Sequence, residues 1–301
     1  MSRSRIVPCL WFDSQAEQAV AFYQQVFPES GVIATSRYAG ASDNPDGEPR
    51  GKVLTVEFEL GSLRFTALNG GPHFTMNPSI SFFVHVDSVD EADRLFAALA
   101  QDGDVMMPLG SYPWSERYGW VKDRFGASWQ VIAGRRPPGG ATVVPCLMFV
   151  GAQHGRAEEA MLAYAGIFPN SRQDSVARYT ADEGPAGTVK HGRFLLDGQD
   201  MIAADSHFDH GFSFSEGISL QVTCEDQAEV DHYWAALGQG GAHGQCGWLK
   251  DRFGLSWQVV PAALSRLLSG TDQAAVARAF AAMMSMTKLD IAELERAFRG
   301  A

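Results

Sequence analysis

Hydrophobic residues follow one pattern four times along the chain. A run that alternates hydrophobic and polar residues comes first, an amphipathic helical run follows, and three short alternating runs end the unit. In the first unit the helix starts near Ala16, with strands near 32–38, 52–60 and 62–68. In the second the helix starts after Ser88, with strands near 104–109, 117–122 and 128–133. The sequence therefore predicts four β-α-β-β-β modules and an α+β fold.

Two long segments of the chain repeat each other. The segment Trp120–Ile132 returns as Trp248–Val260, and Val7–Phe12 returns as Val144–Phe149. Because the repeats keep their order, we interpret the chain as two tandem copies of one domain, each with two modules. We expect a first domain at 1–135, a second at 141–262 and a helical C-terminal tail at 263–301. The turn-rich segment 134–140 is the predicted linker.

Polar residues indicate where the helices begin. Ser14 with Glu17, and Ser88 with Glu91, have the spacing of a capping box, and Asp226 occupies the matching place in the second copy. In the tail, Thr271 and Asp290 are candidate N-caps of two helices. We expect these helices to pack on the second domain or to cover a sheet edge. A methionine-rich helix that binds a partner is the alternative.

Charge and composition narrow the classes of partner. The chain of 301 residues has a net charge of −11, so no basic surplus is present to bind nucleic acid or an anionic membrane. No apolar run approaches the length of a membrane span, and the N-terminal residues contain no apolar signal segment. The four cysteines form no C-x-x-C pair, and Cys9 and Cys146 occupy equivalent positions, which indicates repeated packing residues. We therefore expect a reduced, cytoplasmic protein.

Several motifs resemble one family. The paired modules and the D-x-x-G-x-x-W turn from Asp123 to Trp129 are similar to the vicinal-oxygen-chelate superfamily, which includes glyoxalase I, extradiol dioxygenases and bleomycin-resistance proteins. The PhnB-like branch, often labelled "3-demethylubiquinone-9 3-methyltransferase domain", is resembled by the segments 68–74, 77–82, 112–115, 118–120, 218–220, 229–234, 246–251 and 286–291. The resemblance implies tandem domains, each of two paired modules forming a curved sheet.

The methyltransferase label has no support in the sequence. A Rossmann-type methyltransferase needs a glycine-rich turn that follows a buried strand and opens a helix. The glycine pairs at 70–71, 139–140 and 240–241 lie in predicted turns and in the linker. We therefore do not expect methyl transfer.

The resemblance also implies where a metal ion would bind. Metal-dependent relatives carry a His or Gln on the first strand, a His opening the fifth strand and a Glu on the last. The first-strand ligand falls near Val7 or Pro8 and near Val144 or Pro145, and the other two fall at Ser81 and Gln130 and at Ser219 and Gln258. Hydroxyl and amide groups are poor ligands for a divalent ion. We expect no metal ion and no other cofactor.

Strand alternation places a candidate pocket on the face opposite the helices. In the first copy its expected residues are Ser81, Phe83, His85, Ser128 and Gln130, with Trp114 and Tyr118 on a loop that covers them. In the second copy they are Ser219, Gln221, Thr223, Ser256 and Gln258. Aromatic walls with a few polar groups suit a small organic ligand. The alternative is that these side chains simply fill a narrow barrel.

The missing metal ligands favour a protein that binds a small organic molecule, similar in role to the bleomycin-resistance proteins. One alternative is a metal-dependent lyase, isomerase or dioxygenase of the same superfamily with a displaced metal site; another is a scaffold that binds only protein. Whether the chain is an enzyme stays open. His85 is a candidate general base, Cys246 a candidate nucleophile, and His207 with His210 have metal-like spacing on a predicted loop.

The tandem copies also bear on assembly. Single-domain members of the superfamily commonly pair as homodimers, and two copies in one chain supply that pairing internally. We therefore expect an intrachain pseudo-dimer that is monomeric or weakly associated.

Overall fold

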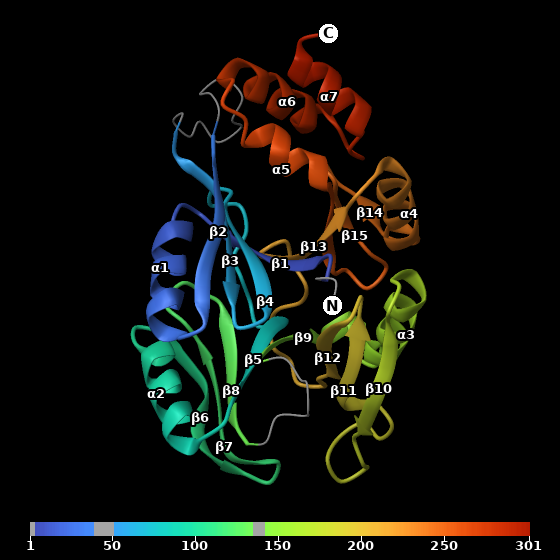
Figure 1. Cartoon of the computed structure of the whole chain (residues 1–301). Coiled ribbons are helices and arrows are strands. Elements are labelled where there is room, and N and C mark those ends of the chain that lie inside the picture. Colours follow the sequence, from blue (N-terminus) through green and yellow to red (C-terminus); the bar gives the residue numbers. More distant parts are fainter. Residues whose placement is uncertain (1–3, 39–50, 135–141) are drawn as a thin grey trace.

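The computed structural model describes residues 4–38, 51–134 and 142–301. Two eight-stranded sheets dominate it, with helices on their outer sides and a helical tail at one end (Figure 1). The α+β class, the four modules and the helical tail agree with the prediction. Apart from Gly134, the predicted linker lies outside the described residues.

Sheet A has the strand order β14-β15-β16-β13-β1-β4-β3-β2. Its strands are β1 (Ile6–Phe12), β2 (Ser30–Arg37), β3 (Val53–Leu60), β4 (Leu63–Asn69), β13 (Ile218–Cys224), β14 (Ala242–His243), β15 (Trp248–Lys250) and β16 (Ser256–Pro261).

Sheet B has the order β10-β11-β12-β9-β5-β8-β7-β6. Its strands are β5 (Ile80–Val86), β6 (Asp104–Tyr112), β7 (Ser115–Lys122), β8 (Ser128–Ala133), β9 (Val143–Phe149), β10 (Arg172–Arg178), β11 (Val189–Leu196) and β12 (Gln199–Asp205).

Each sheet combines one module from each copy of the sequence. In sheet A, β1 of the first copy pairs antiparallel with β13 of the second, and Cys9 lies opposite Ser219. In sheet B, β5 pairs antiparallel with β9, and Ser81 lies opposite Cys146. The two modules of one copy therefore belong to different sheets, and each concave face is built from both copies.

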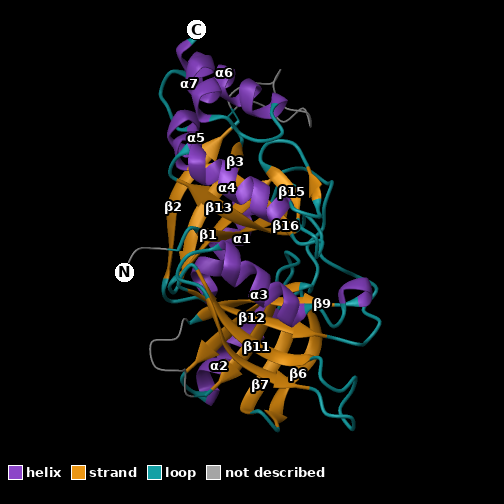
Figure 2. Cartoon of the chain, turned by 90° about the vertical axis from the view of Figure 1, so that its right-hand side faces the viewer, coloured by secondary structure: helices purple, strands orange, loops and turns teal. Residues whose placement is uncertain are grey.

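Within one copy, the two modules pack back to back. The helices α1 (Ala16–Val26) and α2 (Val89–Ala100) lie together on one side of the molecule, and α3 (Ala157–Ile167) and α4 (Gln227–Gly238) lie on the other (Figures 1 and 2). Tyr23 on α1 donates a hydrogen bond to the buried Asp123 carboxylate at 3.0 Å. Tyr164 on α3 donates to Asp251 at 2.6 Å in the same way. These bonds connect the two sheets within each copy.

A repeated turn surrounds each of the two buried aspartates, Asp123 and Asp251. Gly126 and Gly254 have φ angles of 96° and 82°, a region that glycine adopts without strain. Each turn folds back over its aspartate, so that two backbone N–H groups and one tryptophan indole donate to the carboxylate. The charged-looking repeat is therefore a structural turn.

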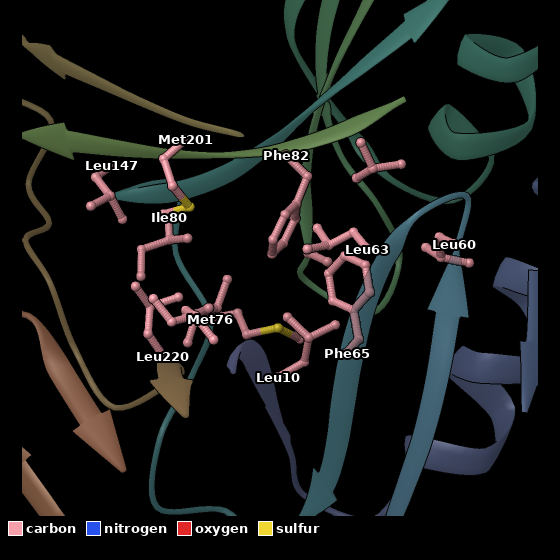
Figure 3. Packing of buried hydrophobic residues seen from close by; sticks show 14 of the residues in the cluster. Leu10, Leu60, Leu63, Phe65, Met76, Ile80, Phe82, Leu147, Met201 and Leu220 are labelled. Carbon is pink, nitrogen blue, oxygen red and sulfur yellow. The ribbon is translucent and has the colours of Figure 1, made fainter. Parts of the chain in front are cut away.

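The core lies where the backs of the two sheets meet. Figure 3 shows Leu10, Phe65 and Leu220 of sheet A converging with Phe82 and Leu147 of sheet B around a common centre. All five side chains are buried, and they come from both copies. The two sheets therefore share one hydrophobic core, and burial of its apolar surface stabilises their packing.

Two of the three predicted caps at module helices are present. Ser88 accepts a hydrogen bond from the Glu91 backbone N–H, and Asp226 accepts one from Glu229. The predicted box at Ser14 is wrong, because α1 begins after Gln15 without a side-chain cap of its own. The buried Asn69 side chain on β4 accepts from the Ala16 N–H instead.

The tail forms three helices rather than the predicted two: α5 (Ala262–Leu268), α6 (Gln273–Ser285) and α7 (Ile291–Arg299). The N-cap of α6 is Asp272, one residue after the predicted Thr271, while Asp290 caps α7 as predicted. The Cys246 and Gly247 backbone N–H groups donate to the carbonyls of Met286 and Thr287. The tail is therefore hydrogen-bonded to the loop between β14 and β15. No helix within the described residues is long and apolar enough to cross a membrane.

Candidate ligand site on sheet A

A cavity of about 580 Å³ lies on the concave face of sheet A. Strands from both copies line it, and the tail helices α5 and α6 supply further lining residues. Figure 1 shows α5 spanning from the β15 side of the sheet toward the β2 side. This volume is in the range of sites that hold small organic ligands.

The floor of this sheet A cavity contains a thiol, a hydroxyl and an amide. The Gln258 amide on β16 donates to the Ser219 hydroxyl on β13 at 2.9 Å. The Cys9 thiol on β1 lies beside both side chains, which act to lower its pKa, but burial outweighs them and raises the pKa to about 11. In the absence of a metal ion, Cys9 is therefore a neutral thiol at physiological pH.

These floor residues do not fit a divalent metal ion. None carries a negative charge, and the amide nitrogen of Gln258, which is a donor, points at Ser219. Within the described residues, no three His, Cys, Asp or Glu side chains come together as a metal-binding group. The first-strand ligand was expected near Val7 or Pro8; the residue that lies opposite Ser219 is the neighbouring Cys9. In sheet B the matching residue is Cys146, opposite Ser81, rather than Val144 or Pro145.

Aromatic side chains form the walls of the cavity. Trp11 on β1 packs edge-on against Phe74 at 4.9 Å between ring centroids and against Trp248 at 5.9 Å. The Trp11 indole N–H donates to the Gly71 carbonyl at 2.8 Å. A Cβ atom at Gly70 would lie 2.3 Å from the Trp11 ring, so this glycine allows the indole to lie where it does.

The tail completes the cavity on the side away from the sheet. Its lining residues are apolar except for two serines: Leu264, Ser265, Leu268, Ser269, Phe280, Met283 and Met284. Phe280 also contacts Tyr38 at 6.4 Å between ring centroids. The Cys246 thiol donates to the Met284 sulfur at 3.5 Å, and burial raises its pKa, so the candidate nucleophile is held as a protonated thiol.

The lining is acidic where it is charged. Glu57 on β3 and Glu216 line the cavity, and none of its described lining residues is a lysine or an arginine. Glu216 pairs with Lys250 at 2.9 Å. The Glu57 side chain makes no hydrogen bond or ion pair with any described residue.

The concave face of sheet B is filled differently. Gln130 on β8 donates to Ser81 at 2.8 Å, as Gln258 does to Ser219, but Gln130 also accepts a hydrogen bond from Tyr118 at 2.5 Å. The Tyr118 and Phe83 rings lie 6.4 Å apart between centroids. The Cys146 side chain belongs to a small apolar cluster that packs against Phe83. The polar groups that face the cavity in sheet A are therefore covered by aromatic side chains in sheet B.

Two equivalent tryptophans show the same divergence. In sheet B, the Trp120 indole donates to the Ser128 hydroxyl at 2.7 Å. In sheet A, Trp248 packs against Trp11 and lines the cavity. The Ser256 hydroxyl, which matches Ser128, is buried and has no hydrogen-bond partner. Trp248 has thus become part of the cavity wall.

The sequence-predicted pocket residues separate into two groups. Gln221 and Gln258 line the sheet A cavity. Ser219 is buried and accepts a hydrogen bond from Gln258, and Ser256 is buried as well. Thr223 does not line the cavity, and its backbone N–H donates to the Arg5 carbonyl. Ser81, Phe83, Tyr118, Ser128 and Gln130 belong to sheet B and line neither this cavity nor a second one of about 210 Å³, which His85 lines.

The predicted covering loop is a β-hairpin. β6 runs to Tyr112 and β7 starts at Ser115, so only Pro113 and Trp114 form the turn. Trp114 is 56% exposed and stacks on Tyr112 at 5.1 Å, while Tyr118 is buried. His210, which the sequence analysis paired with His207 as a possible metal ligand, forms a hydrogen bond of 2.7 Å with the Ser206 hydroxyl.

Sequence reasoning missed Cys9, Glu57, Trp11, Trp248 and the tail as parts of the site. Alternation gave a signal for three of them, since Cys9 and Trp11 share the face of the first strand that lies opposite its core residues. Glu57 alternates in the same way on its own strand. The tail carried no such signal, since a helical stripe does not say which surface it will cover.

Comparison with known proteins agrees with the fold. The family model described as 3-demethylubiquinone-9 3-methyltransferase matches residues 4–132 and 141–260. No curated protein matches the chain in sequence. A PhnB protein from Bacillus cereus is 35% identical over 42% of this chain and 98% of its own, with a TM-score of 0.39.

A longer likeness is to a solved enzyme. Glyoxalase I from Zea mays covers 85% of this chain and 90% of its own, at 10% identity and a TM-score of 0.53, which shows a shared fold. The two family matches account for the two copies of the sequence and span most of its length. The chain therefore belongs to the 3-demethylubiquinone-9 3-methyltransferase family, a PhnB-like branch of the vicinal-oxygen-chelate superfamily, and carries its domain twice in tandem.

Proposed function

We propose that the protein binds one small organic molecule in the sheet A cavity, and does so without the metal centre usual in its superfamily. One observation carries this proposal. The floor positions that hold metal ligands in relatives are occupied here by a protonated thiol, a hydroxyl and an amide beneath a cavity of about 580 Å³. Such groups orient an organic ligand through hydrogen bonds, while the aromatic walls bury its apolar surface.

The proposal assigns the binding role to sheet A alone. In sheet B, Tyr118 and Phe83 cover the equivalent floor, and the Gln130 amide is bonded on both sides. We also propose that the chain is monomeric, since the pairing between β1 and β13 and between β5 and β9 already joins the two copies.

The runner-up function is a metal-dependent lyase, isomerase or dioxygenase. Its support is the fold shared with glyoxalase I, which carries no information on chemistry at 10% identity. Methyl transfer has less support than either. Gly70 and Gly71 lie in a turn beside Trp11, and neither glycine opens a helix that could hold a nucleotide-containing cofactor.

Metal analysis and a ligand screen test the proposal together. We expect the dialysed protein to contain no stoichiometric Zn, Ni, Mn or Fe, and we expect at least one metabolite in a thermal-shift screen to raise its melting temperature. Trp248→Ala should abolish that rise because it removes a cavity wall. Trp114→Ala is the matched control, since it removes an exposed indole from sheet B. A retained metal ion, or a ligand response that survives Trp248→Ala, would contradict the proposal.

A further inference from the structure

Glu57 is the uncompensated charge of the sheet A cavity. Its side chain lines the cavity and is half-buried, and it forms no hydrogen bond or ion pair within the part of the chain that the structure describes. The other lining carboxylate, Glu216, is paired with Lys250. A carboxylate that is partly withdrawn from water and left unpaired carries a desolvation cost that a bound cation offsets.

Strand register places Glu57 in line with the floor. Glu57 lies opposite Thr66, Thr66 beside Cys9, and Cys9 opposite Ser219. Neighbouring strands are about 4.8 Å apart, so Glu57 and Cys9 are separated by about 10 Å along this row. The carboxylate and the neutral floor therefore stand at two ends of a span that a small molecule bridges.

The walls near this row suit a cation as well. Trp11, Phe74 and Trp248 pack edge to face, and Tyr38 and Phe280 stand on the tail side. Aromatic faces attract ammonium groups through their π electrons. The described lining residues include one histidine, His73, but no lysine or arginine, so no lysine or arginine side chain competes for Glu57 inside the cavity.

Sheet B provides an internal comparison. The residue that matches Glu57 in register is Arg193, which lies opposite Ile202, and Ile202 lies beside Cys146. Arg193 pairs with Asp200 at 3.4 Å, and Ile202 belongs to the apolar cluster on that face. The filled sheet thus carries a compensated arginine and an isoleucine where the open sheet carries a free carboxylate and a threonine.

We propose that the ligand of the sheet A cavity carries a positively charged amine, which pairs with Glu57, and an aromatic or apolar body held between Trp11, Trp248 and the tail. The inference rests on the proposed function and names the chemical class of its ligand. The amine donates hydrogen bonds to the Glu57 carboxylate, and the body displaces water from the apolar walls.

Three indole probes that differ in charge test this inference by calorimetry. They are tryptamine, which is cationic, its neutral analogue tryptophol, and anionic indole-3-acetate. We expect tryptamine to bind at least tenfold more tightly than tryptophol, which corresponds to about 1.4 kcal/mol, and indole-3-acetate to bind most weakly.

Substitutions assign the preference to one carboxylate. Glu57→Gln should abolish the preference for tryptamine over tryptophol, and Glu57→Asp should keep part of it, which guards against a folding defect in the first variant. Glu59→Gln is the matched control, because Glu59 lies two residues further along the same strand face and does not line the cavity. It should keep the full preference.

The inference is overturned if tryptophol or indole-3-acetate binds as tightly as tryptamine, if Glu57→Gln keeps the preference, or if none of the three probes binds. In each of these cases the proposed function still stands when a neutral or anionic ligand binds and Trp248→Ala abolishes its binding. It falls as well only when no molecule in the screen binds in a way that depends on Trp248.

Discussion

The two floor glutamines offer a direct test of which sheet is open. Gln130 and Gln258 occupy equivalent positions, and each donates to a buried serine. Gln130 in addition accepts a hydrogen bond from the Tyr118 hydroxyl, and Tyr118 is only 5% exposed. Replacing each glutamine by methionine keeps the length of the side chain and removes its polar atoms.

The expected costs follow from the partners that are left behind. Gln130→Met leaves the buried Tyr118 hydroxyl without its acceptor, at about 1–3 kcal/mol, and removes the bond to Ser81, at about 1 kcal/mol. Gln258→Met removes the bond to Ser219 and a weak interaction with the Cys9 thiol, for a total of about 1 kcal/mol. We expect Gln130→Met to be less stable than Gln258→Met by about 2 kcal/mol.

Urea unfolding at neutral pH measures both values, and binding of a cavity ligand gives the second readout. Gln258→Met should weaken ligand binding at least tenfold, or by about 1.4 kcal/mol, while Gln130→Met should leave it unchanged. An equal loss of stability in the two variants would refute the view that Tyr118 closes sheet B. Weaker ligand binding by Gln130→Met would indicate that the ligand binds on sheet B and would contradict the proposed site.

Three further predictions concern the tail, the buried aspartates and the pairing of the copies. Deleting 262–301 should weaken ligand binding at least tenfold, since the tail supplies one wall of the cavity, and calorimetry of the truncated chain checks this. Burial raises the pKa of Asp123 and Asp251, although each carboxylate accepts four hydrogen bonds. The free energy of unfolding therefore falls as the pH rises from about 4, the pKa of an unfolded aspartate, through the folded pKa. Asp123→Asn should reduce this loss of stability, measured by urea unfolding between about pH 4 and pH 7. Residues 1–135 and 136–301, produced as two polypeptides, should assemble as a one-to-one complex by light scattering, because both sheets join the copies; two separate monomers would contradict this.

Much of the fold could be predicted because alternation and repeats are local signals. The strands near 128–133 and the Ser88 and Asp226 caps occur where the pattern placed them. The partner of each module could not be predicted in this way, because β1 has the same buried face whether it pairs with β5 or with β13. Pairing depends on how whole modules fit together, which no single strand encodes.

The errors in the site have similar physical causes. The first-strand position was expected near Val7 or Pro8; by alternation Pro8 shares the core face with Leu10, and the concave-face residue opposite Ser219 is Cys9. Trp114 and Tyr118 were expected on a loop, yet they lie in the turn and on the second strand of a hairpin whose strands run to Tyr112 and from Ser115. The role of the tail depended on a cavity that only the assembled sheet forms.

Joining the copies in one chain explains how the two faces came to differ. In a symmetric homodimer every substitution appears in both sites, because one gene supplies both. Here Glu57 and Arg193 are separate positions, and so are Trp248 and Trp120, so one face can fill with aromatic side chains while the other keeps its cavity. The tail follows only the second copy, and it lies next to β16, so it reaches sheet A and not sheet B. Two identical subunits would have identical concave faces, so they could not combine one filled face with one open, acidic cavity that is covered by a tail.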